Sequence, residues 1–212
     1  MPLDKSKQIA EVHKRLKKLY PDAQVELEYS NAFELMVASI LAAQNRDTTI
    51  NKITAHLFRK HKGPADYIAA PAEELEADIH KSGFFRQKAK AIKAVSQKLI
   101  DDFNGEVPRT MDEMLTLPGI GRKTATVVLG EAMGIAEGIT VDVHHLRVEA
   151  RLGISEQKLA NKMEKELMNI LPRSNWIEYG QEITWHGRRV CHAKKPSCLS
   201  CVLNDICPSS QA

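Results

Sequence analysis

The segment Leu-Pro-Gly-Ile-Gly-Arg-Lys-Thr-Ala, at residues 117–125, is followed at close range by Val-Asp-Val-His at residues 141–144. Upstream, Thr110 and Glu113 form a capping box that begins a short helix, which the Pro-Gly pair ends. A stretch rich in Ala, Val and Leu then predicts a second helix that ends at Gly134. The pattern indicates a helix, a tight glycine turn and a second helix.

This turn has the residues for anion binding and for nucleophilic chemistry. A turn through Gly119 and Gly121 into Arg122 directs backbone N–H groups outward at a helix N-terminus, which suits a phosphate. Lys123 lies in the first helical turn, where the helix dipole disfavours a cation, and partial burial would lower its pKa further. A neutral amine there can attack a sugar carbon and form a Schiff base. Asp142 lies far enough along the chain to fold back over this helix start. A structural turn with a solvated lysine and a capping aspartate remains the alternative.

Together these motifs resemble the helix-hairpin-helix and Gly/Pro-Asp loop of the endonuclease III DNA glycosylases, and the resemblance extends over nearly the whole chain. It implies Lys123 as the nucleophile and Asp142 as the essential carboxylate. The implied activity is base excision repair by a bifunctional DNA glycosylase and AP lyase, which removes oxidised pyrimidines from duplex DNA by β-elimination. Two alternatives are a monofunctional mismatch-type glycosylase of the same superfamily and a non-catalytic helix-hairpin-helix DNA-binding protein. The presence of Lys123 argues against the first, and the presence of Lys123 together with Asp142 argues against the second.

Helical spacing of apolar residues recurs along the chain, without a strand-like alternation, so we predict an all-α protein. Asn31 and Asp47 are expected helix caps, and Gly63-Pro64 an expected turn. The other helices are predicted at residues 9–19, 33–43, 48–60, from Pro71 to about 82, 86–103, 155–171 and 175–186.

The resemblance implies two helical lobes with a DNA-binding cleft between them. A six-helix lobe is expected at residues 25–135, with the helix-hairpin-helix motif at about 110–134. An iron–sulfur cluster lobe is expected from residues 1–24 together with 136–212.

Composition and charge fit a folded protein that meets a polyanion. The chain has 212 residues, 43% hydrophobic content and a net charge of +3, without an apolar run of membrane-spanning length. Residues 79–100 contain six basic side chains and no acidic one, which favours a polyanion partner or a solvated helix face. The start Met1–Lys5 lacks an apolar signal region. We expect a cytoplasmic, nucleoid-associated monomer that binds DNA with a damaged base or an abasic site.

Some residues are candidates for handling a flipped base. Gln44 can donate to and accept from the orphaned partner base, and the resemblance gives Phe84 the role of an apolar wedge. Phe85 is expected in the core. The family usually has Thr at the positions of Arg46 and Val143 and Leu at that of Phe84, so we expect an altered wall and wedge around the lesion.

The last 22 residues contain the four cysteines, spaced C-x6-C-x2-C-x5-C: Cys191, Cys198, Cys201 and Cys207. One continuous loop of four thiolates suits a [4Fe–4S] cluster, with zinc and disulfides as alternatives. The resemblance implies the cluster, in a structural role. The cluster loop would then present Lys194 and Lys195, near Arg188, to the DNA backbone.

Overall fold

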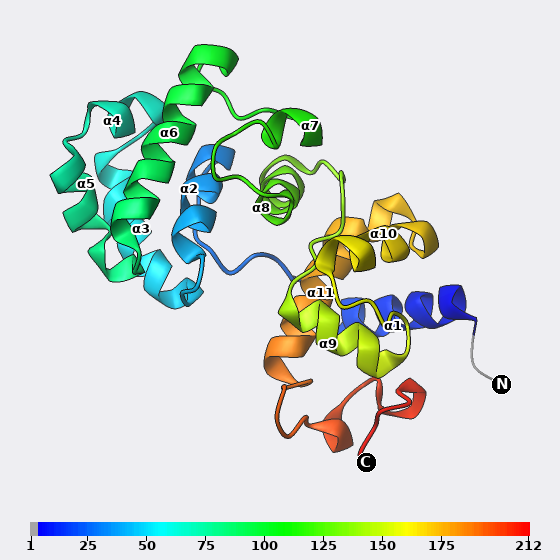
Figure 1. Ribbon diagram of the computed structural model, residues 1–212. Helices are drawn as coiled ribbons and strands as arrows, with labels where there is room; N and C mark the ends of the chain where they lie inside the picture. The colour runs from blue at the N-terminus through cyan, green and yellow to red at the C-terminus, as the bar shows by residue number, and fades with distance from the viewer. Residues whose placement is uncertain (1–3) are drawn as a thin grey trace. The chain divides into compact units, whose positions relative to one another are not determined.

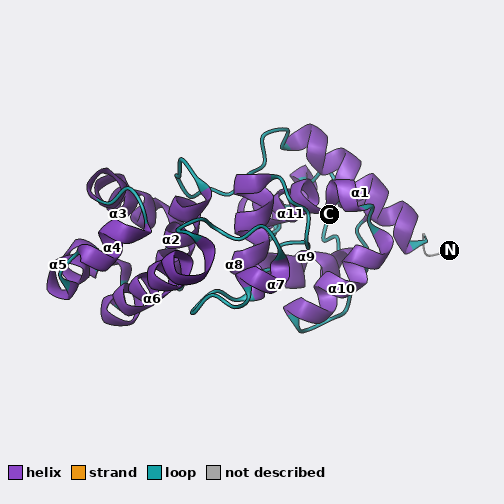
Figure 2. Ribbon diagram, turned by 90° about the horizontal axis from the view of Figure 1, so that it is seen from above, coloured by secondary structure: helices purple, strands orange, loops and turns teal. Residues whose placement is uncertain are grey.

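The computed structural model describes residues 4–212, and they divide into two compact units (Figure 1). The inserted unit spans Glu26–Glu137, and the split unit combines the chain up to Val25 with Gly138–Ala212. Helices and loops, without strands, make up the described residues (Figure 2), which confirms the all-α prediction. The expectation for the start of the chain falls on residues 1–3, outside the described residues.

The inserted unit is built around α2 (Ala32–Ala42), a helix that is apolar on nearly every face. Such a helix is stable only when neighbours cover it on all sides. Its buried apolar residues include Phe33, Met36, Val37, Ile40 and Leu41. The covering elements include α3 (Asp47–Lys60), α6 (Phe85–Phe103), α8 (Arg122–Val127) and the π-helical turn η2 (Val128–Ala132). The remaining helices are α4 (Pro64–Ala69), α5 (Ala72–Asp78), the 3-10 turn η1 (His80–Ser82) and α7 (Met111–Met114).

Three predicted helix boundaries are confirmed by their hydrogen bonds. The Asn31 side chain accepts from the backbone N–H of Glu34 at 2.9 Å. The Thr110 hydroxyl oxygen accepts from the N–H of Glu113 at 3.3 Å. Gly134 has a φ of +67° and follows the last helical turn, where its N–H donates to the carbonyl of Gly130 at 3.0 Å. A residue without Cβ is favoured there because the left-handed region strains other side chains.

Other local predictions are wrong, each for a local reason. Gly63-Pro64 begins helix α4 instead of a turn, because the Asp66 carboxylate accepts from the N–H groups of Lys62 and Gly63 at 2.6 and 3.3 Å. Asp47 is the first residue of α3 and not its cap. The helix expected from Ser155 begins only at Ala160, because the Ser155 hydroxyl forms a local turn with the N–H of Gln157.

The split unit joins the two ends of the chain. It contains α1 (Lys5–Leu19), α9 (Val143–Leu152), α10 (Ala160–Ile170) and α11 (Trp176–Arg189), with the short 3-10 turns η3 (Arg173–Asn175), η4 (Cys198–Ser200) and η5 (Asn204–Ile206). Helix α1 packs against α10 and α11, and α9 packs against α11. A buried pair links α1 to α11, with His13 Nδ1 2.8 Å from Glu182 Oε2. Among residues 4–212, no helix combines the length and the apolar character needed to cross a membrane.

A fully buried carboxyl group lies between α9 and α11. The Tyr179 hydroxyl donates to Glu149 Oε1 at 2.8 Å, and both residues are 0% exposed. Burial raises the pKa of Glu149 to about 8, although the Tyr179 hydrogen bond opposes the shift. The folded protein therefore holds this carboxyl protonated at neutral pH.

We predict that Glu149→Gln makes stability less dependent on pH. In the wild type the unfolded chain loses the Glu149 proton near pH 4.5, whereas the folded chain holds it up to about pH 8, so stability falls across that window. The loss is on the order of a few kcal/mol. Thermal melts from pH 5 to 9 should show the wild-type Tm falling relative to the Gln variant, which keeps the Tyr179 acceptor. Parallel Tm curves would contradict the prediction.

Candidate functional site

The glycine turn of the inserted unit exposes the start of α8. Gly119 has a φ of +79°, and a Cβ there would lie 3.6 Å from Ala91 Cβ. Gly121 is in extended conformation as the N-cap of α8. Lys123, in the first turn of this helix, is exposed. The structure thus does not show partial burial of Lys123, because the first turn of α8 faces outward with the glycine turn that precedes it.

The two candidate base-handling residues lie beside this turn. Gln44, Phe84 and Gly119 all line one hollow of about 330 Å³ in the inserted unit. Gln44 is exposed, and Phe84 is 62% exposed although it is a large apolar side chain. Phe85 is half-buried against His80, with ring centroids 4.6 Å apart, so the core position expected for it is only partly correct.

Asp142 is anchored at the N-terminus of α9 in the split unit. Its Oδ1 accepts from the N–H of His144 at 2.7 Å and of His145 at 3.2 Å, and lies 3.4 Å from His145 Nδ1. A carboxylate is stabilised there by the free N–H groups and the helix dipole. The Asp142 side chain is 12% exposed, whereas the next residue, Val143, is 68% exposed. The Asp142 carboxylate thus caps α9 and remains partly exposed.

Two arginines of α9 fasten this helix to the loop that follows α11. Arg147 donates to the carbonyls of Gly187 and Cys191 at 2.8 and 3.0 Å. Arg151 donates to Cys191 Sγ at 3.2 Å and to the carbonyl of His192 at 2.7 Å. Being four residues apart, the arginines lie on the same face of α9. The Asp142 helix and the first cysteine are therefore held together.

The four predicted metal-ligating cysteines converge. All four line one cavity of about 170 Å³: Cys191, Cys198, Cys201 and Cys207. None forms a disulfide, so the disulfide alternative is not observed. Burial, together with the charges of the other thiolates, raises the pKa of the Cys201 and Cys207 thiols. Thiolates crowded in this way are stabilised when a metal centre binds them, and a loop of four such donors fits a [4Fe–4S] cluster.

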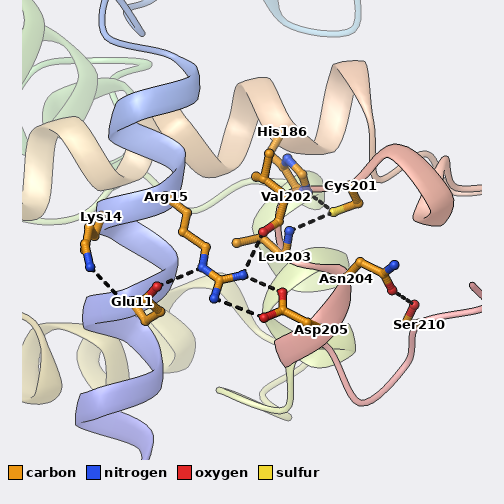
Figure 3. Close-up of polar contacts among 10 residues, drawn as sticks. All are labelled: Glu11, Lys14, Arg15, His186, Cys201, Val202, Leu203, Asn204, Asp205 and Ser210. Atoms are coloured by element: carbon orange, nitrogen blue, oxygen red, sulfur yellow. Dashed lines mark hydrogen bonds and ion pairs between the residues drawn. The ribbon is translucent and has the colours of Figure 1, made fainter.

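The cysteine loop is braced from α1 and α11 (Figure 3). Arg15 of α1 donates to the carbonyl of Val202 at 2.9 Å and pairs with the Asp205 carboxylate at 2.5 Å. His186 Nε2 of α11 lies 3.5 Å from Cys201 Sγ, and burial lowers the pKa of His186 to about 4. A neutral imidazole therefore contacts the thiol at neutral pH.

The predicted basic contacts lie at two places in the split unit. Arg188 is partly exposed near the end of α11. Burial lowers the pKa of His144, the charges of Arg147 and Arg188 lower it further, and the charge of Asp142 opposes the shift. Lys194 and Lys195 are exposed in the loop between the first two cysteines. Lys123 belongs to the inserted unit and Asp142 to the split unit.

Comparison with known proteins shows the family of this chain. The family described as the HhH-GPD superfamily of base excision DNA repair proteins matches residues 37–173. Endonuclease III of Synechocystis sp. is 43% identical over 208 residues, covering 98% of this chain and 95% of the relative. The chain belongs to the endonuclease III family. It is accordingly a base excision repair enzyme, a DNA glycosylase and AP lyase.

Solved structures of endonuclease III show the same fold. A non-covalent complex with DNA and a trapped covalent intermediate with DNA each match with a TM-score of 0.91 and 43% identity. Each match covers 97% of this chain and 96% of the solved chain.

The sequence did not predict several residues of this endonuclease III fold. Arg147 and Arg151 were not identified because neither belongs to a motif, and only tertiary contact brings them to the cysteine loop. Gly187 was missed for the same reason. A Cβ on Gly187 would lie 2.7 Å from His144 Cβ, so this glycine permits α9 and α11 to approach closely.

We predict that Gly187→Ala destabilises the protein although alanine favours helices. The clash with His144 must displace the first turn of α9 and, with it, the Asp142 carboxylate. A loss of about 1–3 kcal/mol is expected, measured by denaturant unfolding, with a parallel loss of glycosylase rate. Gly63→Ala is the control, since a Cβ there meets nothing within 4 Å. Equal stability of Gly187→Ala and the wild type would contradict the prediction.

Proposed function

We propose that Lys123 is the nucleophile and Asp142 the essential carboxylate with which this enzyme removes oxidised pyrimidines from duplex DNA. The observation that carries the proposal is an exposed lysine in the first turn of α8, directly after a left-handed glycine turn, in a chain of this family. The Asp142 carboxylate, one oxygen of which accepts from two backbone N–H groups and lies 3.4 Å from His145 Nδ1, supports the second assignment.

The reaction needs a neutral amine and a stabilised positive charge on the sugar. Lys123 Nζ attacks C1′ with its lone pair, and the glycosidic bond breaks so that the damaged base leaves with the bonding electrons. The nitrogen then loses one proton, the C1′–O4′ bond of the sugar ring breaks as O4′ takes up a proton, and a protonated Schiff base forms between Nζ and C1′. Asp142 assists by accepting a proton or by stabilising the cationic sugar. Loss of a C2′ proton then expels the 3′ phosphate, and hydrolysis of the Schiff base returns the lysine.

The base must leave the helical stack before it reaches the lysine. Phe84, a large exposed apolar side chain, is proposed to enter the stack as a wedge. Gln44, in the same hollow, would hydrogen-bond to the orphaned base with its amide. The N–H groups around Gly119 and Gly121, with Arg122, are proposed to bind a phosphate beside the lesion.

We further propose that the four converging cysteines hold a [4Fe–4S] cluster: Cys191, Cys198, Cys201 and Cys207. When bound, the cluster supplies four Fe–S bonds that cross-link the end of the chain. Lys194, Lys195 and Arg188 would then add salt-sensitive contacts to the DNA backbone. We infer a monomer that acts on duplex DNA with a damaged base or an abasic site in the cytoplasm, at the nucleoid.

Borohydride trapping on a duplex with one thymine glycol tests the catalytic assignment. The wild type and the matched control Lys162→Gln should form a covalent adduct with DNA, and Lys123→Gln should form none. Base release by the wild type without an adduct would favour a monofunctional glycosylase. Binding with neither would favour a non-catalytic DNA-binding protein. Each of these outcomes contradicts the proposal.

Metal analysis tests the cluster. Protein purified without oxygen should contain about four iron atoms per chain and matching sulfide. Cys198→Ser should lose most of the iron, whereas Ser200→Ala, two residues away, should retain it. Zinc in place of iron would contradict the proposed cluster and favour the zinc alternative.

A further inference from the structure

Two neighbouring loops of the inserted unit share an unusual backbone conformation. Gln44, after α2, has a φ of +58°, and Phe84, before α6, has a φ of +47°. Neither residue is glycine, so both are in a region that side chains normally avoid. Such conformations persist only where surrounding contacts fix them.

The contacts come from Lys88, one turn into α6. Lys88 is 6% exposed, and its ammonium donates to three backbone carbonyls: Leu41 at 2.7 Å, Ala43 at 3.0 Å and Ser82 at 2.7 Å. An ammonium has three N–H donors, so these bonds use all of them. Two of the carbonyls lead into Gln44, and the third lies two residues before Phe84. Burial lowers the pKa of Lys88. The acceptors of its three hydrogen bonds are backbone carbonyl oxygens and not carboxylates.

Asn45 makes a second link between the same loops. Its amide nitrogen donates to the carbonyls of Ser82 and Lys81, at 2.9 and 3.4 Å. The Ser82 carbonyl thus accepts from two donors, Lys88 of α6 and Asn45 of the loop after α2. We call residues 43–46 and 82–84 the paired loops.

The paired loops carry both side chains that the proposed function places in the duplex. Gln44, Phe84 and Lys88 line the same hollow beside Gly119. We propose that Lys88 is a positioning residue that joins the paired loops into one rigid element, so that Phe84 and Gln44 enter the DNA together at a fixed separation. This inference rests on the proposed function. Separating stacked bases costs free energy, which the contacts of the inserted side chains must supply. Loops that are already fixed in the inserting conformation do not spend part of that free energy on their own rearrangement.

Lys93 offers a matched control on the same helix. Its ammonium also donates to backbone carbonyls, those of Ile68 at 3.0 Å and of Ala70. These carbonyls lie around the end of α4, outside the paired loops. Lys93→Met and Lys88→Met therefore make the same chemical change, but only the second releases the paired loops.

The first measurement is a double-mutant cycle of Lys88→Met with Phe84→Ala, read by single-turnover excision of thymine glycol. We expect Lys88→Met to lower the rate about tenfold in the wild type, and less than about twofold when Phe84 is already Ala, because the lysine acts through the wedge. Lys93→Met should leave the rate within about twofold in both backgrounds. An equal factor for Lys88→Met in both backgrounds overturns the inference, since a general structural defect would act independently of Phe84.

The second measurement is amide hydrogen exchange, which needs no activity. Exchange in the paired loops should become faster in Lys88→Met but not in Lys93→Met, while the centre of α2 stays protected in both. Unchanged exchange in the paired loops overturns the inference. Failure of the proposed function is distinguishable, because it appears as a wild type that forms no borohydride adduct while the exchange result still decides the role of Lys88.

Discussion

The hydrogen bonds from the N-terminus of α9 to the Asp142 carboxylate are the interaction that the other contacts of the split unit hold in place. They fix one carboxylate oxygen, and α9 itself is fixed in turn by contacts along its length. Arg147 and Arg151 bind it to the cysteine loop, and the buried Glu149 binds it to α11. Helix α1, far away in sequence, braces the same cysteine loop through Arg15. The position of the Asp142 side chain therefore depends on elements from both ends of the chain.

The inserted unit holds three loops on a core built around α2. Its central helix α2 is surrounded by apolar neighbours, so the unit has a rigid core from which three loops emerge. The glycine turn exposes Lys123, and the loops with Gln44 and Phe84 reach the same hollow. Each loop contains positive φ angles, at Gly119 in the first, at Gln44 in the second, and at Gly83 and Phe84 in the third. Strain concentrated at exposed tips, over a rigid core, is typical of sites that must deform a ligand.

Much of this arrangement was predictable from the sequence, because it depends on local rules. Asn31, Thr110 and Gly134 mark helix ends through their own backbone contacts, and the all-α fold follows from apolar spacing. The rest depends on tertiary contact. Lys88 reads as one cation of a basic helix face, and only the folded chain brings three carbonyls to it. The exposure of Lys123 depends on the outward direction of the glycine turn, which cannot be inferred from residue types. Helix α4 was missed because Gly-Pro is common both in turns and at helix starts.

The assignment of one lysine as the nucleophile is tested most directly by locating the covalent bond. Wild-type protein is reduced with borohydride on a thymine glycol duplex, digested with nuclease and protease, and its peptides are mapped by mass spectrometry. The account predicts a sugar remnant on Lys123 Nζ alone. A remnant on another lysine, or on the N-terminal amine, would contradict it.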